Sequence, residues 1–155
     1  MKLQVKKLII ALVVPLGVGG LSALLSGSMA GFQELDAPPL TPPGWLFPVV
    51  WTILYLLMGY ASYRIWTADA EPTQKAQALI LYGLQLAVNF LWPPVFFRWE
   101  LRLTAFWVLL LLWILVFVTM RMFYRLDERA GDLMLPYLLW VTFAGYLNLG
   151  FFLEN

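Results

Sequence analysis

The chain has 155 residues, of which 62% are hydrophobic, 17% aromatic and only 12% charged. Soluble globular proteins are about 45–50% apolar and about 25% charged, so this composition predicts a membrane protein and excludes an ordinary soluble domain. The absence of Cys and His excludes disulfides, Cys/His metal sites and imidazole acid–base catalysis, and the net charge of +1 argues against a nucleic-acid partner.

Long uncharged stretches are the main signal for secondary structure, because a charged side chain at the bilayer centre costs about 2.5–3.5 kcal/mol. Each stretch is close to the roughly 20 residues that a helix needs to cross a hydrocarbon core of about 30 Å. We therefore predict an all-α integral membrane protein, a single domain of five transmembrane helices at residues 8–26, 44–65, 76–97, 103–122 and 133–153.

The first predicted span has a competing interpretation. Lys2, Lys6 and Lys7 precede an apolar run that is followed by Ser28-Met29-Ala30, a pattern that also fits a secretory signal cleaved after Ala30. The run is longer than the usual apolar region of a signal, and its small residues suit packing on another helix. The intact mass of the protein distinguishes the two interpretations.

The first connection, residues 27–43, is long and acidic and contains four prolines. Proline restricts its own backbone and that of the preceding residue, so we expect this connection to be stiff. It is predicted to act as a lid over the outer ends of the helices, and the alternative is an extended linker.

The basic residues predict an orientation. Eight of the ten Lys and Arg residues lie before the first span or in the second and fourth connections. Because cytoplasmic loops carry the excess of Lys and Arg, we expect the N-terminus in the cytoplasm and the C-terminus outside. The expected location is that of a multi-pass protein in a bacterial cell membrane.

The polar residues inside the spans are neutral, since no acidic or basic residue lies near a predicted midplane. This argues against ion-coupled transport. Helical spacing places the neutral groups in stripes along three of the spans. The stripe on the second span consists of Trp51, Tyr55, Met58 and Ser62. The stripe on the third span consists of Gln85, Asn89 and Trp92, and that on the fifth of Trp140, Ala144 and Asn148. The stripes indicate either hydrogen-bonded packing between helices or an uncharged aromatic cavity.

The other tryptophans are assigned differently. Trp45, Trp66 and Trp99 lie at the ends of predicted spans and fit an interfacial belt, whereas Trp107 and Trp113 are expected to face lipid or pack.

Three ordered segments resemble the TspO/MBR family, the tryptophan-rich sensory and translocator proteins. They are LDAPPLTPPGWLFPVVW at 35–51, QLAVNFLWPPVFF at 85–97 and PYLLWVTFAGYLN at 136–148. The resemblance implies a five-helix bundle, usually a homodimer, that requires no cofactor and binds porphyrins, sterols or synthetic aromatic compounds in a pocket beneath the first loop. The ligand-binding residues expected from these motifs and from the polar stripes are Phe32, Pro42, Pro43, Trp51, Asn89, Trp92, Trp140, Ala144, Leu147 and Asn148, with the two prolines in the lid.

The chain also departs from the family pattern. Family members often carry Trp-Tyr where this chain has Gly31-Phe32, Lys in place of Ala37 and Trp in place of Leu40. The sterol motif of animal members is absent after Asn148, so no sterol binding is predicted through it.

We therefore expect a membrane receptor or sensor that holds a porphyrin or haem-type tetrapyrrole between Trp51 and Trp140, with Asn89 hydrogen-bonded to a polar edge. One alternative is light-dependent porphyrin breakdown with the two indoles as redox partners, although the expected pocket contains no acid, base or metal ligand and so does not favour an enzyme. A second alternative is translocation of a porphyrin or lipid. A third is a dimeric scaffold with Gly83 and Ala87 at its contact face.

Overall fold

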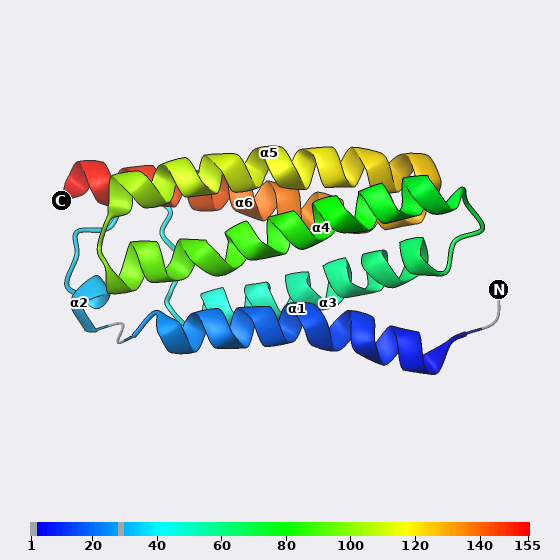
Figure 1. The fold of residues 1–155 in the computed structure, drawn as a ribbon. Coiled ribbons are helices and arrows are strands. Elements are labelled where there is room, and N and C mark those ends of the chain that lie inside the picture. The colour runs from blue at the N-terminus through cyan, green and yellow to red at the C-terminus, as the bar shows by residue number, and fades with distance from the viewer. Residues whose placement is uncertain (1–2, 28–29) are drawn as a thin grey trace.

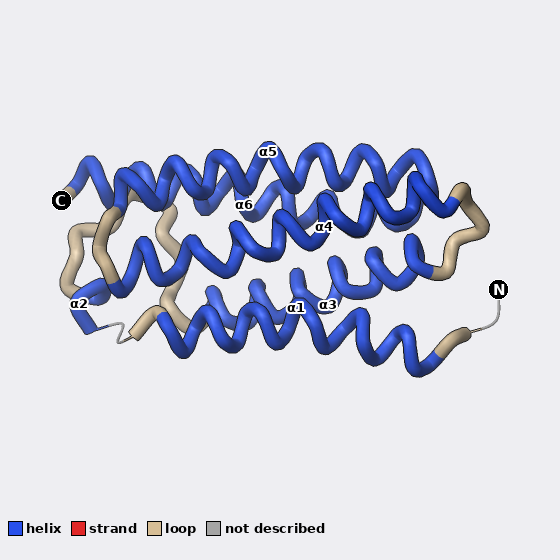
Figure 2. The backbone as a smooth tube through the Cα atoms, in the orientation of Figure 1, coloured by secondary structure: helices blue, strands red, loops and turns tan. Residues whose placement is uncertain are grey.

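The computed structural model describes residues 3–27 and 30–155, in which all regular structure is helical (Figures 1 and 2). Five of the helices are long and apolar enough to cross a membrane, which confirms the predicted fold class. The helices, in chain order, are α1 (Val5–Leu25), α2 (Ala30–Gln33), α3 (Leu46–Trp66), α4 (Pro72–Pro93), the π-helix η1 (Pro94–Arg98), α5 (Arg102–Leu126) and α6 (Glu128–Glu154).

The long helices run lengthwise beside one another and alternate in direction along the chain (Figure 1). The α2 segment, the connection from η1 to α5 and the C-terminus lie at one end of the bundle. The described N-terminal residues, the α3–α4 connection and the α5–α6 turn lie at the other end. We call these the α2 end and the N-terminal end.

Several helices extend beyond the predicted spans. Helix α1 begins at Val5 instead of residue 8, α4 at Pro72 instead of 76, and α6 at Glu128 instead of 133. Gaps between charges delimit the part of a helix that lies in hydrocarbon, whereas the helix itself continues into the polar headgroup region, where charged side chains stay solvated.

Local capping explains the start of α4. The carboxylate of Glu71 accepts hydrogen bonds from the backbone N–H groups of Thr73 and Gln74, both at 3.0 Å. Pro72 occupies the first helical position, where no N–H is needed. These bonds lower the pKa of Glu71, because they favour its ionised form.

Glycines allow α1 and α3 to approach closely. A Cβ added at Gly59 of α3 would lie 2.6 Å from the carbonyl oxygen of Ala11, and one at Gly19 of α1 would collide with the ring of Tyr55. Among the small residues of α1, Gly19 therefore packs against α3, whereas a Cβ added at Gly17 or Gly20 would meet no atom within 4 Å. Of the proposed cleavage segment, Ser28 and Met29 lie outside the described residues.

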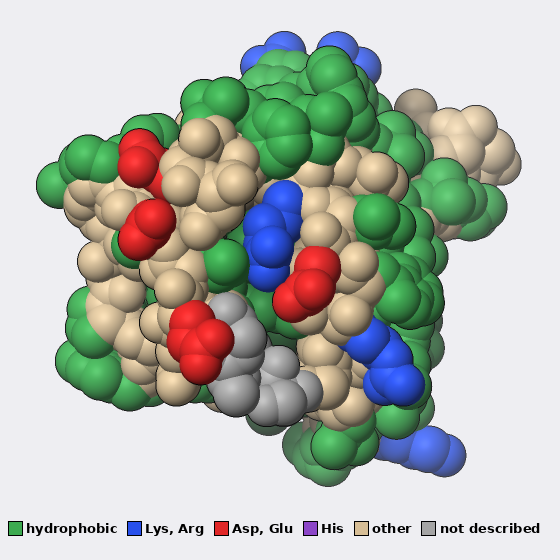
Figure 3. Space-filling model, turned by 90° about the vertical axis from the view of Figure 1, so that its left-hand side faces the viewer, with side chains coloured by type: hydrophobic (Ala, Val, Ile, Leu, Met, Phe, Trp, Pro, Cys, Tyr) green, Lys and Arg blue, Asp and Glu red, His purple; other side chains and the backbone are tan. Residues whose placement is uncertain are grey.

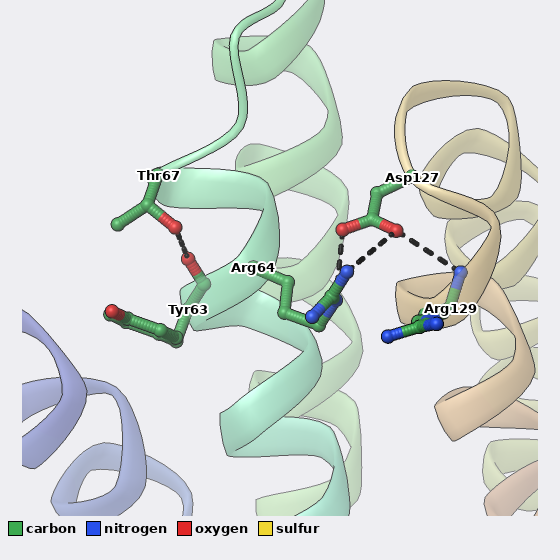
Figure 4. A network of polar contacts seen from close by, with 5 residues as sticks. All are labelled: Tyr63, Arg64, Thr67, Asp127 and Arg129. Atoms are coloured by element: carbon green, nitrogen blue, oxygen red, sulfur yellow. Dashed lines mark hydrogen bonds and ion pairs between the residues drawn. The ribbon is translucent and has the colours of Figure 1, made fainter. Parts of the chain in front are cut away.

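The N-terminal half of the bundle has a closed interior. The side chains of Ile65, Ala78, Phe123, Ala130 and Met134 are completely buried and belong to one hydrophobic cluster formed by α3, α4, α5 and α6. An ion pair joins the helix ends outside this cluster: Nε and Nη2 of Arg64 lie 2.9 and 3.3 Å from the two carboxylate oxygens of Asp127, which also caps α6 through the backbone N–H of Arg129 (Figure 4).

At the α2 end, the first connection is attached to α6. The Tyr146 hydroxyl donates to the Pro39 carbonyl oxygen at 2.6 Å, and the Asn155 side chain exchanges two hydrogen bonds with the backbone of Asp36. Pro38 packs so closely on Gly150 that a Cβ there would lie 2.5 Å away. The short helix α2 within this connection was not expected from the sequence. The end face carries both acidic and basic side chains (Figure 3).

Candidate functional site

A cavity of about 440 Å³ lies in the α2 half of the bundle and is lined by residues of all five long helices, α2 and η1. Its volume falls within the range of small-molecule sites, about 300–1,000 Å³. Eight of the ten predicted site residues line it: Phe32, Trp51, Asn89, Trp92, Trp140, Ala144, Leu147 and Asn148.

The two prolines predicted in the lid lie elsewhere. Pro42 and Pro43 do not line the cavity, and the carbonyl oxygen of Pro43 accepts the backbone N–H of Leu46 at the start of α3, at 3.0 Å. The described residues of the first connection that do reach the cavity are Gly27 and Phe32. Phe32 lies in α2 and packs against Phe97 and Phe151 with ring centroids 5.1 and 4.8 Å apart.

Consecutive prolines shape the wall contributed by α4 and η1. Pro93 and Pro94 have no N–H to donate, and the helix widens so that the backbone N–H of Trp99 bonds to the Pro94 carbonyl oxygen, five residues earlier, at 3.0 Å. This wider turn carries Phe96 and Phe97, both of which line the cavity.

The indoles of Trp51 and Trp140 meet edge to face. Their ring centroids are 6.4 Å apart and their planes are inclined by 87°. A flat ring held between two parallel indoles would need planes separated by about 7 Å, twice a stacking distance of about 3.5 Å. In this conformation the two indoles therefore leave no parallel slot for a tetrapyrrole between them, and one face of Trp51 is stacked on Tyr55.

Two of the cavity indoles differ in their hydrogen bonding. Nε1 of Trp92 donates to Oδ1 of Asn148 at 2.9 Å, and Nδ2 of Asn148 donates to the carbonyl oxygen of Arg102 at 2.8 Å. Nε1 of Trp140 is buried and has no acceptor among the described residues. Since a buried indole N–H normally has a partner, Trp140 offers an unused donor at the cavity wall.

Asn89 belongs to a buried chain of hydrogen bonds at the base of the cavity. The Tyr55 hydroxyl donates to Oδ1 of Asn89 at 2.9 Å, and Nδ2 of Asn89 donates to the Tyr137 hydroxyl at 2.7 Å. The Tyr137 hydroxyl donates in turn to Oε1 of Gln85 at 2.7 Å, and Nε2 of Gln85 lies 3.9 Å from Sδ of Met58. Tyr55 and Asn89 line the cavity, whereas the other three residues do not.

Both interpretations of the polar stripes therefore describe part of the structure. Gln85 and Met58 take part in packing and hydrogen bonding between helices, and Asn89 and Trp92 border the cavity. Tyr137, the central residue of the chain, was not predicted, because a single Tyr in an apolar helix carries no distinguishing pattern.

Helix α1 also contributes to the wall, through Leu16, Gly19, Gly20 and Ala23. Gly19, Gly20 and Ala23 are among the small residues of this helix that were expected from the sequence to pack on another helix. Gly19 does pack against Tyr55, and the same absence of side chains leaves the space of the cavity beside it.

The described lining residues include no Asp, Glu, Lys or Arg. No group of three or more potential metal ligands occurs among the described residues. The cavity can thus hold a neutral aromatic group through apolar contact and a few hydrogen bonds, but it offers no charge to neutralise an ionised group.

The fold and the cavity define a class: a multi-pass membrane protein of five helices with an uncharged, aromatic-lined internal cavity. The family model described as TspO/MBR family matches residues 11–153, so the chain belongs to the TspO/MBR family.

Named relatives come from bacteria, archaea and animals. The chain is 44% identical over 117 residues to the tryptophan-rich sensory protein of Cereibacter sphaeroides, covering 76% of this chain and 72% of that protein. It is 37% identical over 125 residues to the translocator protein of Bos taurus, covering 80% and 74%. It is 30% identical over 155 residues to the tryptophan-rich protein TspO of Archaeoglobus fulgidus, covering 99% of each. A membrane sensor or translocator role follows from this membership.

Proposed function

We propose that this protein is a membrane receptor or sensor that binds porphyrin-like tetrapyrroles and other flat hydrophobic ligands in the cavity beneath the first connection. The observation that carries the proposal is the uncharged cavity of about 440 Å³ with Trp51, Trp92 and Trp140 in its wall. Aromatic walls favour planar ligands through stacking and edge contacts, and a few polar groups orient them.

The side chains suit the macrocycle of a metal-free porphyrin better than haem. Haem iron is usually held by His, Cys, Met or Tyr. The chain contains no His or Cys, and Tyr55, the one Met or Tyr among the described lining residues, has its hydroxyl hydrogen-bonded to Asn89. No charged side chain is available at the described wall to pair with a propionate. We therefore expect the propionates to point toward the α2 end, where Arg98 is exposed.

The proposed orientation places the α2 end outside the cytoplasm. Lys6 and Lys7, the α3–α4 connection and the α5–α6 turn belong to the opposite end (Figure 1), where the Lys and Arg excess favours the cytoplasm. The first connection would then cover a cavity that is entered from the outer half of the membrane, in a bacterial cell membrane.

The closed N-terminal half favours binding over translocation. A ligand crossing the membrane would have to pass Ile65, Phe123 and Met134, which are completely buried. Flux of porphyrin into proteoliposomes in excess of the rate for protein-free vesicles would support translocation and contradict a purely receptor role.

Titration with protoporphyrin IX tests the proposal. Tryptophan fluorescence of the protein in lipid nanodiscs should be quenched to saturation, and Trp51→Phe and Trp140→Phe should each weaken binding about three- to tenfold, because each loses an indole contact. Trp107→Phe is the matched control, since this indole is 58% exposed and lies outside the cavity wall. Equal affinity in all three variants and the original protein would reject the site.

A further inference from the structure

The buried series of side-chain hydrogen bonds that runs from Tyr55 through Asn89, Tyr137 and Gln85 has its donor direction set by its last member, Met58. Sδ of Met58 has no hydrogen and can only accept. Because the carboxamide of Gln85 lies 3.9 Å from that sulfur, its N–H₂ group faces Met58 and its oxygen faces Tyr137. The reverse orientation would place the Gln85 oxygen, an acceptor, against the Met58 sulfur, which is also an acceptor.

The orientation of Gln85 determines which group donates in every other hydrogen bond of the series. Tyr137 has a single hydroxyl proton, which it donates to Gln85, so its oxygen must accept from Asn89. Nδ2 of Asn89 therefore faces Tyr137 and Oδ1 faces Tyr55, whose own proton is donated to it at 2.9 Å. Gln85 and Tyr137 are fully buried, and a buried polar group without a partner is costly, so each of their donors must meet an acceptor within the protein.

The direction decides what the base of the cavity offers to a ligand. Tyr55 lines the cavity and Tyr137 does not, so the Asn89 oxygen lies on the cavity side of its carboxamide and the nitrogen on the core side. The Tyr55 proton is already used. What remains on the cavity side is a second lone pair on Oδ1 of Asn89 and the lone pairs of the Tyr55 oxygen, all of which are acceptors.

We propose that Gln85 and Tyr137 are positioning residues that hold the Asn89 carboxamide in this orientation, so that the base of the cavity accepts a hydrogen bond from the ligand. The polar group bound there carries an N–H or O–H donor, such as a pyrrole N–H. The donor chemistry of the ligand rests on the proposed function. The sequence predicted a hydrogen bond between Asn89 and a polar edge of the ligand without a direction, and the orientation inferred here makes Asn89 the acceptor. The buried N–H of Trp140 supplies the opposite polarity at the wall.

Carbazole and dibenzofuran form a suitable pair of probes, because they are planar tricycles of nearly the same shape that carry N–H and O at the same position. Their dissociation constants would be measured by displacement of protoporphyrin IX in nanodiscs, or by direct quenching of tryptophan fluorescence, and corrected for partition into protein-free nanodiscs. We expect carbazole to bind about five- to tenfold more tightly than dibenzofuran, the factor of one hydrogen bond.

Two variants remove the positioning without touching the cavity wall. In Gln85→Met the Tyr137 proton is free to turn toward Asn89, which allows the carboxamide to turn over. In Tyr137→Phe the Asn89 nitrogen loses its acceptor. In both, the preference for carbazole should fall below about twofold. Tyr82→Phe is the matched control, because this buried tyrosine lies outside both the chain and the wall, and it should retain the full preference.

The ratio of the two affinities separates positioning from general destabilisation, which would weaken both probes alike. A preference for dibenzofuran in the original protein, or a carbazole preference that survives in Gln85→Met and Tyr137→Phe, overturns the inference while leaving ligand binding intact.

Failure of the proposed function gives a different result: neither probe nor protoporphyrin IX binds. In that case the role of Tyr137 in positioning the Asn89 carboxamide is tested on the ligand-free protein. With ¹⁵N-labelled asparagine side chains, the Asn89 amide proton that bonds to Tyr137 should move upfield in Tyr137→Phe and stay in place in Tyr82→Phe. An unchanged signal in Tyr137→Phe overturns the positioning role.

Discussion

The contact between α1 and α3 at Gly59 leads to a quantitative prediction for Gly59→Ala. The added Cβ would lie 2.6 Å from the Ala11 carbonyl oxygen and 3.1 Å from Cα of Leu12, whereas ordinary contacts begin at 3.4 Å. These neighbours are backbone atoms and cannot rotate away. The two helices must therefore separate by about 0.8 Å, the difference between the two distances.

The expected cost follows from two opposing effects. Overpacking of this kind costs about 1–3 kcal/mol, while replacing Gly by Ala within a helix gains up to about 1 kcal/mol. The control Gly17→Ala has the same gain without the collision, since no atom lies within 4 Å of its added Cβ. We expect Gly59→Ala to be about 1–3 kcal/mol less stable than Gly17→Ala.

The free energy of unfolding can be measured by titrating sodium dodecyl sulfate into detergent-solubilised protein and following helical circular dichroism. Porphyrin affinity provides a second readout, because α1 forms part of the cavity wall through Leu16. If Gly59→Ala proves as stable as Gly17→Ala, the close contact between α1 and α3 is wrong.

Three further predictions concern the proposed dimer and the helix ends. In a chain without Cys, Gly83→Cys should form a disulfide-linked dimer under oxidation if the exposed face of α4 is the proposed homodimer contact, and a purely monomeric product on a non-reducing gel contradicts that face. The pKa of Glu71 is lowered below its ordinary value of 4.5, so its stabilisation of α4 is present above that pH and is lost as the pH falls through the lowered value; Glu71→Gln should lack this acid-dependent loss in thermal unfolding. Asp127→Asn keeps a helix cap but removes the charge paired with Arg64, and should lower the free energy of unfolding by about 1–2 kcal/mol; the same loss in an Arg64→Ala background would show that the pair is not its cause.

The positions of the spans and most of the residues around the cavity were predictable from the sequence. Charges avoid the hydrocarbon, so their gaps located five helices, and the spacing of Asn89 and Trp92 placed both on one face of α4. The α2 segment was not predictable, because a helix of four residues lacks a periodic signal and depends on contacts such as that of Phe32 with Phe151.

The sequence by itself determined that this protein lies in a membrane, that its interior is uncharged and that aromatic residues gather within three of its helices. Only the tertiary structure decided how those groups face one another: the perpendicular indoles of Trp51 and Trp140, and the orientation of the Asn89 carboxamide. The reason is physical. Helical periodicity places a residue on a face, but the rotamer of a side chain and the direction of its hydrogen bond depend on partners such as Tyr137, which lies 48 residues away in the chain and on another helix.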